Sequence, residues 1–258
     1  MPFAPVNGMQ LYHEVHGPEI GGAPVVVFAH GAGGNHLSWW QQVPHFREAF
    51  TCVTFDHRAF GQSADTTGAG GGAFVDDLRG LLDHLGIERA HLVAQSMGGW
   101  TCLGFALKYP ERVAKLVMSD THGGLRGPGI DMGAARAALP ALPPGVHPGL
   151  GARAYAEQPT LAFLYQQISD LNPARSPEAL GVLLRSAGAP TVAELEGFAT
   201  PTLFIIGEED ASIPAPVLEA AAKLVPGAVV ERFPQSGHSV YFERAERYNE
   251  VVQAFIRA

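Results

Sequence analysis

Residues 94–99 read Ala-Gln-Ser-Met-Gly-Gly, and this stretch decides the fold. It joins a short apolar run, residues 91–94, to a stretch of helical character that begins at Gly98. A serine on a sharp turn between a strand and a helix, with small residues two positions before and two after it, is typical of a nucleophile elbow. Ala94 and Gly98 occupy those two positions. The stretch therefore predicts that Ser96 is a nucleophile at the amino end of a helix, where free N–H groups favour developing negative charge.

Strand-like and helix-like segments alternate along the rest of the chain. Strand-like runs, several of them continuously apolar as in buried parallel strands, occur at 25–29, 50–55, 91–94, 113–119, 202–206 and 229–233. Helical spacing of apolar residues marks 74–85, the residues from Gly98 to about Lys108, and a final amphipathic helix over 241–255. This alternation predicts an α/β fold with a mostly parallel, doubly wound sheet. A hairpin is expected within residues 1–16, around Asn7-Gly8.

The segment 122–198 differs from both flanks, because it is rich in Gly, Pro and Ala and contains no good strand. It carries two helix starts instead, at Ser176 and at the capping box that begins at Thr191. We therefore expect a core formed by residues 1–121 and 199–258, with a helical cap inserted over 122–198.

Composition excludes several classes of protein. The 258 residues are 47% hydrophobic and 16% charged, which suits a buried core and argues against disorder. A net charge of −8 without a run of Lys or Arg argues against nucleic-acid binding. No signal peptide and no membrane-spanning run are visible, so a cytoplasmic protein without a membrane partner is expected. Cys52 and Cys102 lie in apolar surroundings and are expected to be buried thiols.

Polar residues follow four of the predicted strands. A glycine-rich loop, His30–Gly34, follows the first of them, and it lacks the Lys-Ser/Thr that a phosphate-binding loop would need. Asp210 and His238 each follow a later strand. Because loops at the carboxyl ends of parallel strands line one crevice, Ser96, Asp210 and His238 should meet there. A histidine can then take the serine proton, and a carboxylate can fix the histidine tautomer.

Two further acids lie at the ends of predicted strands. Asp120 also ends a predicted strand and is the alternative carboxylate partner, although Asp210 is preferred. Asp56 and Arg58, in the loop after the strand at 50–55, are expected to pair and brace that loop.

The elbow, the glycine-rich loop and the order Ser…Asp…His together resemble the α/β-hydrolase fold family, and the resemblance covers essentially the whole chain. It implies that Ser96 is the nucleophile, His238 the base and Asp210 the acid. It also implies an oxyanion hole formed by the backbone N–H groups of Ala32 and Met97.

The family usually carries Asp-x-Arg-Gly-x-Gly-x-Ser after its fourth strand, and Ala59 replaces the first Gly here. A serine at the elbow argues against haloalkane dehalogenases and epoxide hydrolases, which use Asp. We expect a cofactor-independent serine hydrolase that cleaves a small carboxylic ester or lactone through an acyl-enzyme. The alternatives are a carbon–carbon bond hydrolase of aromatic degradation with the same triad, a perhydrolase, and a ligand receptor that retains the triad.

Specificity should lie in the cap and the residues below it. The histidines show no metal-ligand spacing, so no metal is expected. Residues expected to contact substrate are His30, Trp100, His122, Phe163, Leu164 and Tyr165.

Overall fold

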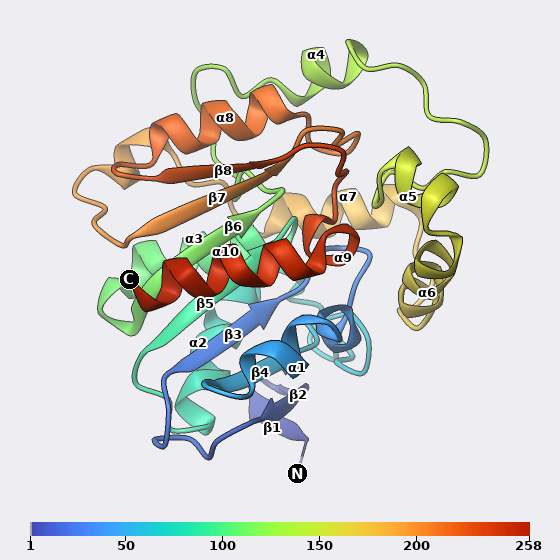
Figure 1. The fold of residues 1–258 in the computed structure, drawn as a ribbon. Helices are drawn as coiled ribbons and strands as arrows, with labels where there is room; N and C mark the ends of the chain where they lie inside the picture. Colours follow the sequence, from blue (N-terminus) through green and yellow to red (C-terminus); the bar gives the residue numbers. More distant parts are fainter. Residues whose placement is uncertain (1) are drawn as a thin grey trace.

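The predicted strands form one eight-stranded sheet in the computed structural model, which describes residues 2–258 (Figure 1). The strand order is β1-β2-β4-β3-β5-β6-β7-β8. All neighbours from β4 to β8 pair in parallel, whereas β2 is antiparallel to both β1 and β4. The predicted α/β fold with a mostly parallel sheet is confirmed. The strands are β1 (Phe3–Val6), β2 (Met9–His16), β3 (Val25–Ala29), β4 (Thr51–Phe55), β5 (Ala90–Gln95), β6 (Val113–Ser119), β7 (Thr202–Gly207) and β8 (Val229–Phe233).

The amino-terminal hairpin forms where the sequence predicts it. Val6 of β1 lies opposite Met9 of β2, which leaves a two-residue turn. Asn7 and Gly8 both adopt positive φ angles, 42° and 77°. Two consecutive residues in this region define the type of turn that matches the twist of a hairpin, and Asn-Gly is its preferred sequence.

Helices cover both faces of the sheet and so bury the apolar strands (Figure 1). One face packs against α2 (Phe74–His84), α3 (Gly98–Lys108) and α8 (Ala215–Leu224). The other face packs against α1 (Gln42–Phe46) and α10 (Ala245–Arg257). Coverage on both sides explains why every residue of β3 and β4 is buried.

The carboxyl-terminal helix differs from the sequence expectation in one respect. The predicted continuous helix is two helices, α9 (Val240–Glu243) and α10, because Arg244 between them leaves the helical region with φ −133° and ψ 47°. The apolar face of α10 still buries Tyr248 and Val252 against the sheet. Three short 3-10 helices complete the parts flanking the sheet: η1 (His36–Trp39), η2 (Gly70–Ala73) and η3 (Pro110–Arg112).

Between β6 and β7 the chain forms helices and, within 122–198, no strand. Its elements are α4 (Met132–Ala137), α5 (Ala152–Glu157), α6 (Pro159–Asp170), α7 (Pro177–Ser186) and the 3-10 helix η4 (Val192–Leu195). Both helix starts predicted here are present: the Ser176 hydroxyl accepts the Ala179 N–H, and Thr191 and Glu194 form a capping box. Figure 1 shows α5 and α6 beyond the carboxyl ends of the parallel strands.

Cys52 and Cys102 are both fully buried and unpaired, as predicted. None of the helices in residues 2–258 combines the length and the hydrophobicity that a membrane-spanning helix requires.

Candidate active site

The turn at Ser96 lies between β5 and α3 and has an unusual backbone. Ser96 adopts φ +48°, in the left-handed region that costs a non-glycine residue about 1–2 kcal/mol. The next turn of chain passes close to β3: a Cβ on Gly98 would lie 2.2 Å from the carbonyl oxygen of Ala29. Only glycine fits there, which is the physical reason for the small residue that the sequence shows two positions after Ser96.

Asp210 and His238 come from neighbouring loops at the end of the sheet. The Oδ2 atom of Asp210 lies 2.8 Å from Nδ1 of His238. The other oxygen, Oδ1, accepts the backbone N–H groups of Ser212 and Ile213 at 2.7 and 2.8 Å. A carboxylate can only accept, so Nδ1 carries the hydrogen and Nε2 of His238 is free to accept a proton. His238 and Ser96 line the same cavity.

Asp120, the alternative acid, has other partners. Its Oδ1 accepts the Gly207 N–H at 2.8 Å and its Oδ2 accepts the Val240 N–H at 3.3 Å. It is fully buried, and burial together with the nearby charge of Asp210 raises the pKa of its carboxyl well above the usual value. Asp120 thus joins the end of β7 to the start of α9, and His238 contacts Asp210 instead.

Two backbone N–H groups beside Ser96 are free to bind an anion. Ala32 and Met97 both line the cavity. Neither N–H has a hydrogen-bond acceptor within residues 2–258. Their loops meet closely, because a Cβ on Gly31 would lie 2.0 Å from Oε1 of Gln95.

Gln95 is a further residue of the site, and it was not predicted from the sequence. Its Nε2 donates to the carbonyl oxygen of His238 at 2.8 Å, and the residue lines the cavity beside the serine. A polar side chain at the end of a buried apolar strand was the available signal. Gln95 thereby links the serine turn, the glycine-rich loop and the histidine loop.

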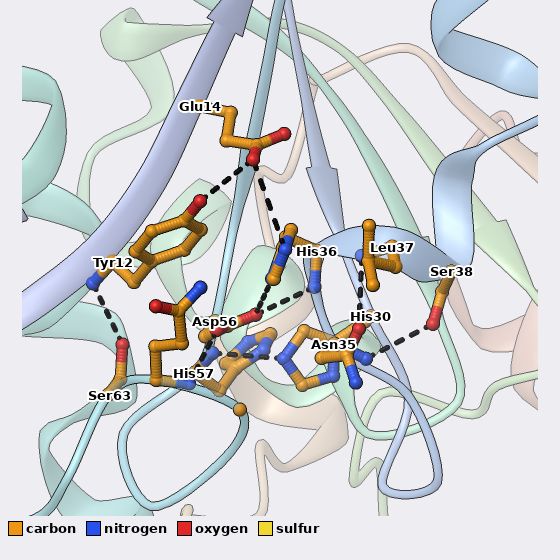
Figure 2. Close-up of polar contacts among 12 residues, drawn as sticks. Tyr12, Glu14, His30, Asn35, His36, Leu37, Ser38, Asp56, His57 and Ser63 are labelled. Carbon is orange, nitrogen blue, oxygen red and sulfur yellow. Dashed lines mark hydrogen bonds and ion pairs between the residues drawn. The ribbon is translucent and has the colours of Figure 1, made fainter. Parts of the chain in front are cut away.

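His30 does not line the cavity, so the expectation that it contacts substrate is corrected. It is the first residue of the glycine-rich loop and is fully buried, in a polar cluster drawn in Figure 2. Its Nε2 accepts the His57 N–H at 2.9 Å, so Nδ1 carries the hydrogen and donates to the Gly31 carbonyl at 2.7 Å. Burial lowers the pKa of His30 to about 4 and keeps it neutral. The ring therefore holds the peptide bond that precedes Ala32.

The predicted pairing of Asp56 with Arg58 is wrong. Asp56 instead accepts both the backbone N–H and the Nδ1 hydrogen of His36, at 2.7 and 2.8 Å (Figure 2). Arg58 pairs with Asp77 of α2 at 2.7 Å and with Asp65 at 2.9 Å. A guanidinium offers a planar fork of donors, and Asp77 accepts from both Nε and Nη2 of Arg58, at 2.8 and 2.7 Å. Both pairs still brace the loop.

The cavity has a volume of about 720 Å³. Trp100, His122 and Tyr165, three of the residues proposed from the sequence to contact substrate, line it. Phe163 and Leu164 do not, and this part of the expectation is corrected. Phe163 is 66% exposed on the outer face of α6, whereas Leu164 packs against the apolar cluster beneath that helix. On a helix, three consecutive residues point in different directions, so Tyr165 alone of the three reaches the cavity.

The chemistry of the cavity wall is mixed. Burial lowers the pKa of His122 to about 4, so its ring, which packs edge-on to Trp100 at 4.8 Å, is neutral. Arg175, in the loop before α7, packs over Phe60 at 4.5 Å and donates through Nη2 to the Ala59 carbonyl oxygen. It lines the cavity and forms no ion pair with a carboxylate among the residues described. No group of three or more His, Cys, Asp or Glu side chains in residues 2–258 is arranged to hold a metal ion.

Comparison with known proteins identifies the family. The family model described as "alpha/beta hydrolase fold" matches residues 24–149. The chain is 30% identical, over 95% of both chains, to "Putative carbamate hydrolase RutD" of Caulobacter sp. (strain K31). It is 31% identical to 2-hydroxy-6-oxo-6-phenylhexa-2,4-dienoate hydrolase of Comamonas testosteroni, over 94% of this chain and 91% of the relative. This chain belongs to the alpha/beta hydrolase family.

Solved structures of other alpha/beta hydrolases share the fold. An enol-lactonase from Burkholderia xenovorans LB400 superposes with a TM-score of 0.81 at 23% identity, covering 100% of both chains. A thermophilic esterase from Thermogutta terrifontis superposes with a TM-score of 0.78 at 26% identity, covering 99% of this chain and 97% of the esterase. Together with the family match and the relatives named as hydrolases, this likeness identifies the protein as an enzyme of the alpha/beta hydrolase type.

Proposed function

We propose that this enzyme is a serine hydrolase that cleaves carboxylic esters or lactones through an acyl-enzyme intermediate. Ser96 is the nucleophile, His238 the general base and Asp210 the acid that orients it. The observation that carries the proposal is the 2.8 Å contact between Asp210 and Nδ1 of His238, because it leaves Nε2 free on the wall of the cavity that Ser96 also lines. Two free N–H groups, on Ala32 and Met97, lie on the same wall.

The reaction then proceeds in two steps, acylation of Ser96 and hydrolysis of the acyl-enzyme. Nε2 of His238 takes the Ser96 proton as Oγ attacks the carbonyl carbon, and the N–H groups of Ala32 and Met97 bind the resulting oxyanion. The imidazolium gives its proton to the alcohol oxygen as the carbon–oxygen bond breaks, which leaves the acyl group on Ser96. Water, deprotonated by His238, attacks the acyl carbon, and collapse of the second tetrahedral intermediate releases the acid and restores Ser96.

Residues 122–198 act as a cap that selects the substrate in this proposal. Tyr165 on α6 and Arg175 before α7 both line the cavity that Ser96 and His238 also line. A small-molecule substrate would therefore be enclosed between the triad loops and these helices. The chemistry resides in the core loops and the choice of acyl or alcohol group in the 122–198 segment.

A carbon–carbon bond hydrolase with the same triad is the second candidate. Arg175 favours it, because its guanidinium lines the cavity, spends one donor on the Ala59 carbonyl and keeps further N–H donors for a substrate carboxylate. Several relatives at 31% identity are named as hydrolases of dienoates or dienedioates. An ester that carries a free carboxylate on its acyl part would fit both the first proposal and Arg175.

The test is chemical labelling combined with turnover of a short aryl ester. A fluorophosphonate should label Ser96 alone, and Ser96→Ala should lose labelling and lower turnover by about 10⁴-fold or more. Ser186→Ala, which changes an exposed serine on α7, is the matched control and should behave as the wild type. Labelling that maps to another serine, or near-normal turnover by Ser96→Ala, would reject the proposal. Comparing the ester with a 2-hydroxy-6-oxo-dienoate then separates ester hydrolysis from carbon–carbon cleavage.

A further inference from the structure

The short segment 147–151, between α4 and α5, packs directly on the loops that carry the proposed acid and base. The hydroxyl of Ser212, two residues after Asp210, donates to the Pro148 carbonyl at 2.8 Å. The hydroxyl of Ser239, next to His238, donates to the Gly149 carbonyl at 2.6 Å. The same segment lines the cavity through His147, Pro148 and Gly149. It therefore contacts the substrate space on one side and both loops on the other.

Glu243 provides a third and more specific link. Its Oε1 accepts the Gly151 N–H and its Oε2 accepts the Gly237 N–H, both at 3.0 Å. The carboxylate is 5% exposed, and it pairs with these N–H groups and not with a cation among residues 2–258. Burial raises the pKa of this carboxyl, while the N–H groups of Gly237, Gly151 and Ser239 and the nearby charge of Arg244 oppose the rise. A buried carboxylate is costly unless its oxygens are satisfied, so the N–H groups of Gly151 and Gly237 are needed to hold it.

The two backbones that Glu243 joins approach each other closely. A Cβ on Gly237 would lie 2.3 Å from the backbone nitrogen of Gly151. The N–H groups of two neighbouring segments, at Gly151 and Gly237, both donate to one carboxylate. An amide side chain offers only one acceptor oxygen and could not replace it. The residue after Gly237 is His238, so the position of this bridge sets the position of the histidine backbone.

We infer that Glu243 is a positioning residue, whose carboxylate bridges the Gly151 and Gly237 N–H groups and thereby fixes the His238 loop against the 147–151 segment. The inference rests on the proposed role of His238 as the base. Glu243 does not touch the reacting atoms, and it acts through the placement of Nε2 relative to Ser96. The packing of the 147–151 segment and the placement of the base are then coupled through one carboxylate.

The experiment compares Glu243→Gln with the wild type and with Leu82→Ala, a buried position on α2 far along the chain from the cavity loops. A glutamine can accept only one of the two N–H groups and presents an NH₂ to the other. We expect kcat for a short aryl ester to fall by about tenfold to a hundredfold, as for a small misplacement of a catalytic group. KM should change less than kcat, and phosphonylation of Ser96 should slow in parallel. Leu82→Ala should lower Tm and leave kcat unchanged at a temperature where it is folded.

Each outcome decides the matter. Wild-type kcat in Glu243→Gln, or a loss no larger than that of Leu82→Ala at equal destabilisation, would overturn the inference. If Glu243→Gln does not fold, Glu243→Asp replaces it, since the shorter acid keeps its charge but cannot reach both N–H groups, and the same fall in kcat is expected. Ser96→Ala, measured in parallel, separates the two proposals: an active Ser96→Ala rejects the serine mechanism, whereas an inactive one beside a fully active Glu243→Gln rejects only the positioning role.

Discussion

Asp210→Asn exchanges one oxygen for an NH₂ group and should move the imidazole hydrogen of His238 from Nδ1 to Nε2. Oδ1 of Asp210 accepts two backbone N–H groups, from Ser212 and Ile213. In the variant, the amide oxygen must stay at that position, because turning the amide would place its NH₂ against two donors. Each buried N–H left without an acceptor costs about 1–3 kcal/mol, so the turned amide is disfavoured by about 2–6 kcal/mol.

The NH₂ group therefore faces Nδ1 of His238, donates to it, and moves the imidazole hydrogen to Nε2. A histidine in that tautomer cannot accept the Ser96 proton. We expect kcat to fall by about 10⁴-fold, which corresponds to about 5 kcal/mol of transition-state stabilisation.

Steady-state hydrolysis of a chromogenic acetate ester measures the effect, with Asp120→Asn as the matched comparison. Asp120 is buried near the same loops but accepts from Gly207 and Val240, so its variant should lose stability more than activity. Retention of kcat within about tenfold in Asp210→Asn, or a larger loss in Asp120→Asn, would refute this reasoning.

Two further predictions concern selectivity and pH. Tyr165→Ala should shift relative kcat/KM among esters of increasing acyl length by about 1–3 kcal/mol, whereas Phe163→Ala, on the exposed face of the same helix, should leave the profile unchanged. Equal profiles for both variants would show that Tyr165 is not a specificity residue. Burial lowers the pKa of His30 from 6.5 to about 4, so between these values the unfolded state binds more protons and the free energy of unfolding falls as pH drops. Urea denaturation at pH 7 and at pH 5 measures the free energy of unfolding. Between these pH values it should fall by about 2 kcal/mol less in His30→Asn than in the wild type. An equal fall in both proteins would contradict a buried neutral histidine.

Much of the fold could be predicted because its signals are local. Apolar runs such as 25–29 and helical spacing at 74–85 depend on neighbouring residues, and the structure places β3 and α2 within a residue of those bounds. The turn at Ser96 carries its own steric signature in Gly98. The division of the helix at Arg244 has no comparable local signal, since apolar spacing continues across it.

The supporting contacts could not be predicted, because they depend on which residues meet in space. Arg58 stands two positions from Asp56 in the sequence, yet its partner Asp77 lies nineteen positions away on α2. His30 resembles a pocket residue in the sequence. Only the structure shows that its two ring nitrogens already bind the His57 N–H and the Gly31 carbonyl. Gln95 and Glu243 become visible only when the His238 loop is placed beside them.

The order of the strands has a consequence for synthesis of the protein. Ser96 follows β5, in the middle of the sheet, whereas Asp210 and His238 follow β7 and β8, which are added at one edge after all other strands. A chain emerging from the ribosome begins to fold from its amino-terminal part. A growing chain thus displays its serine long before it possesses a base to activate it. Under the proposed mechanism the nascent polypeptide cannot hydrolyse a substrate, and activity begins only when β8 joins the sheet and brings His238 to Ser96.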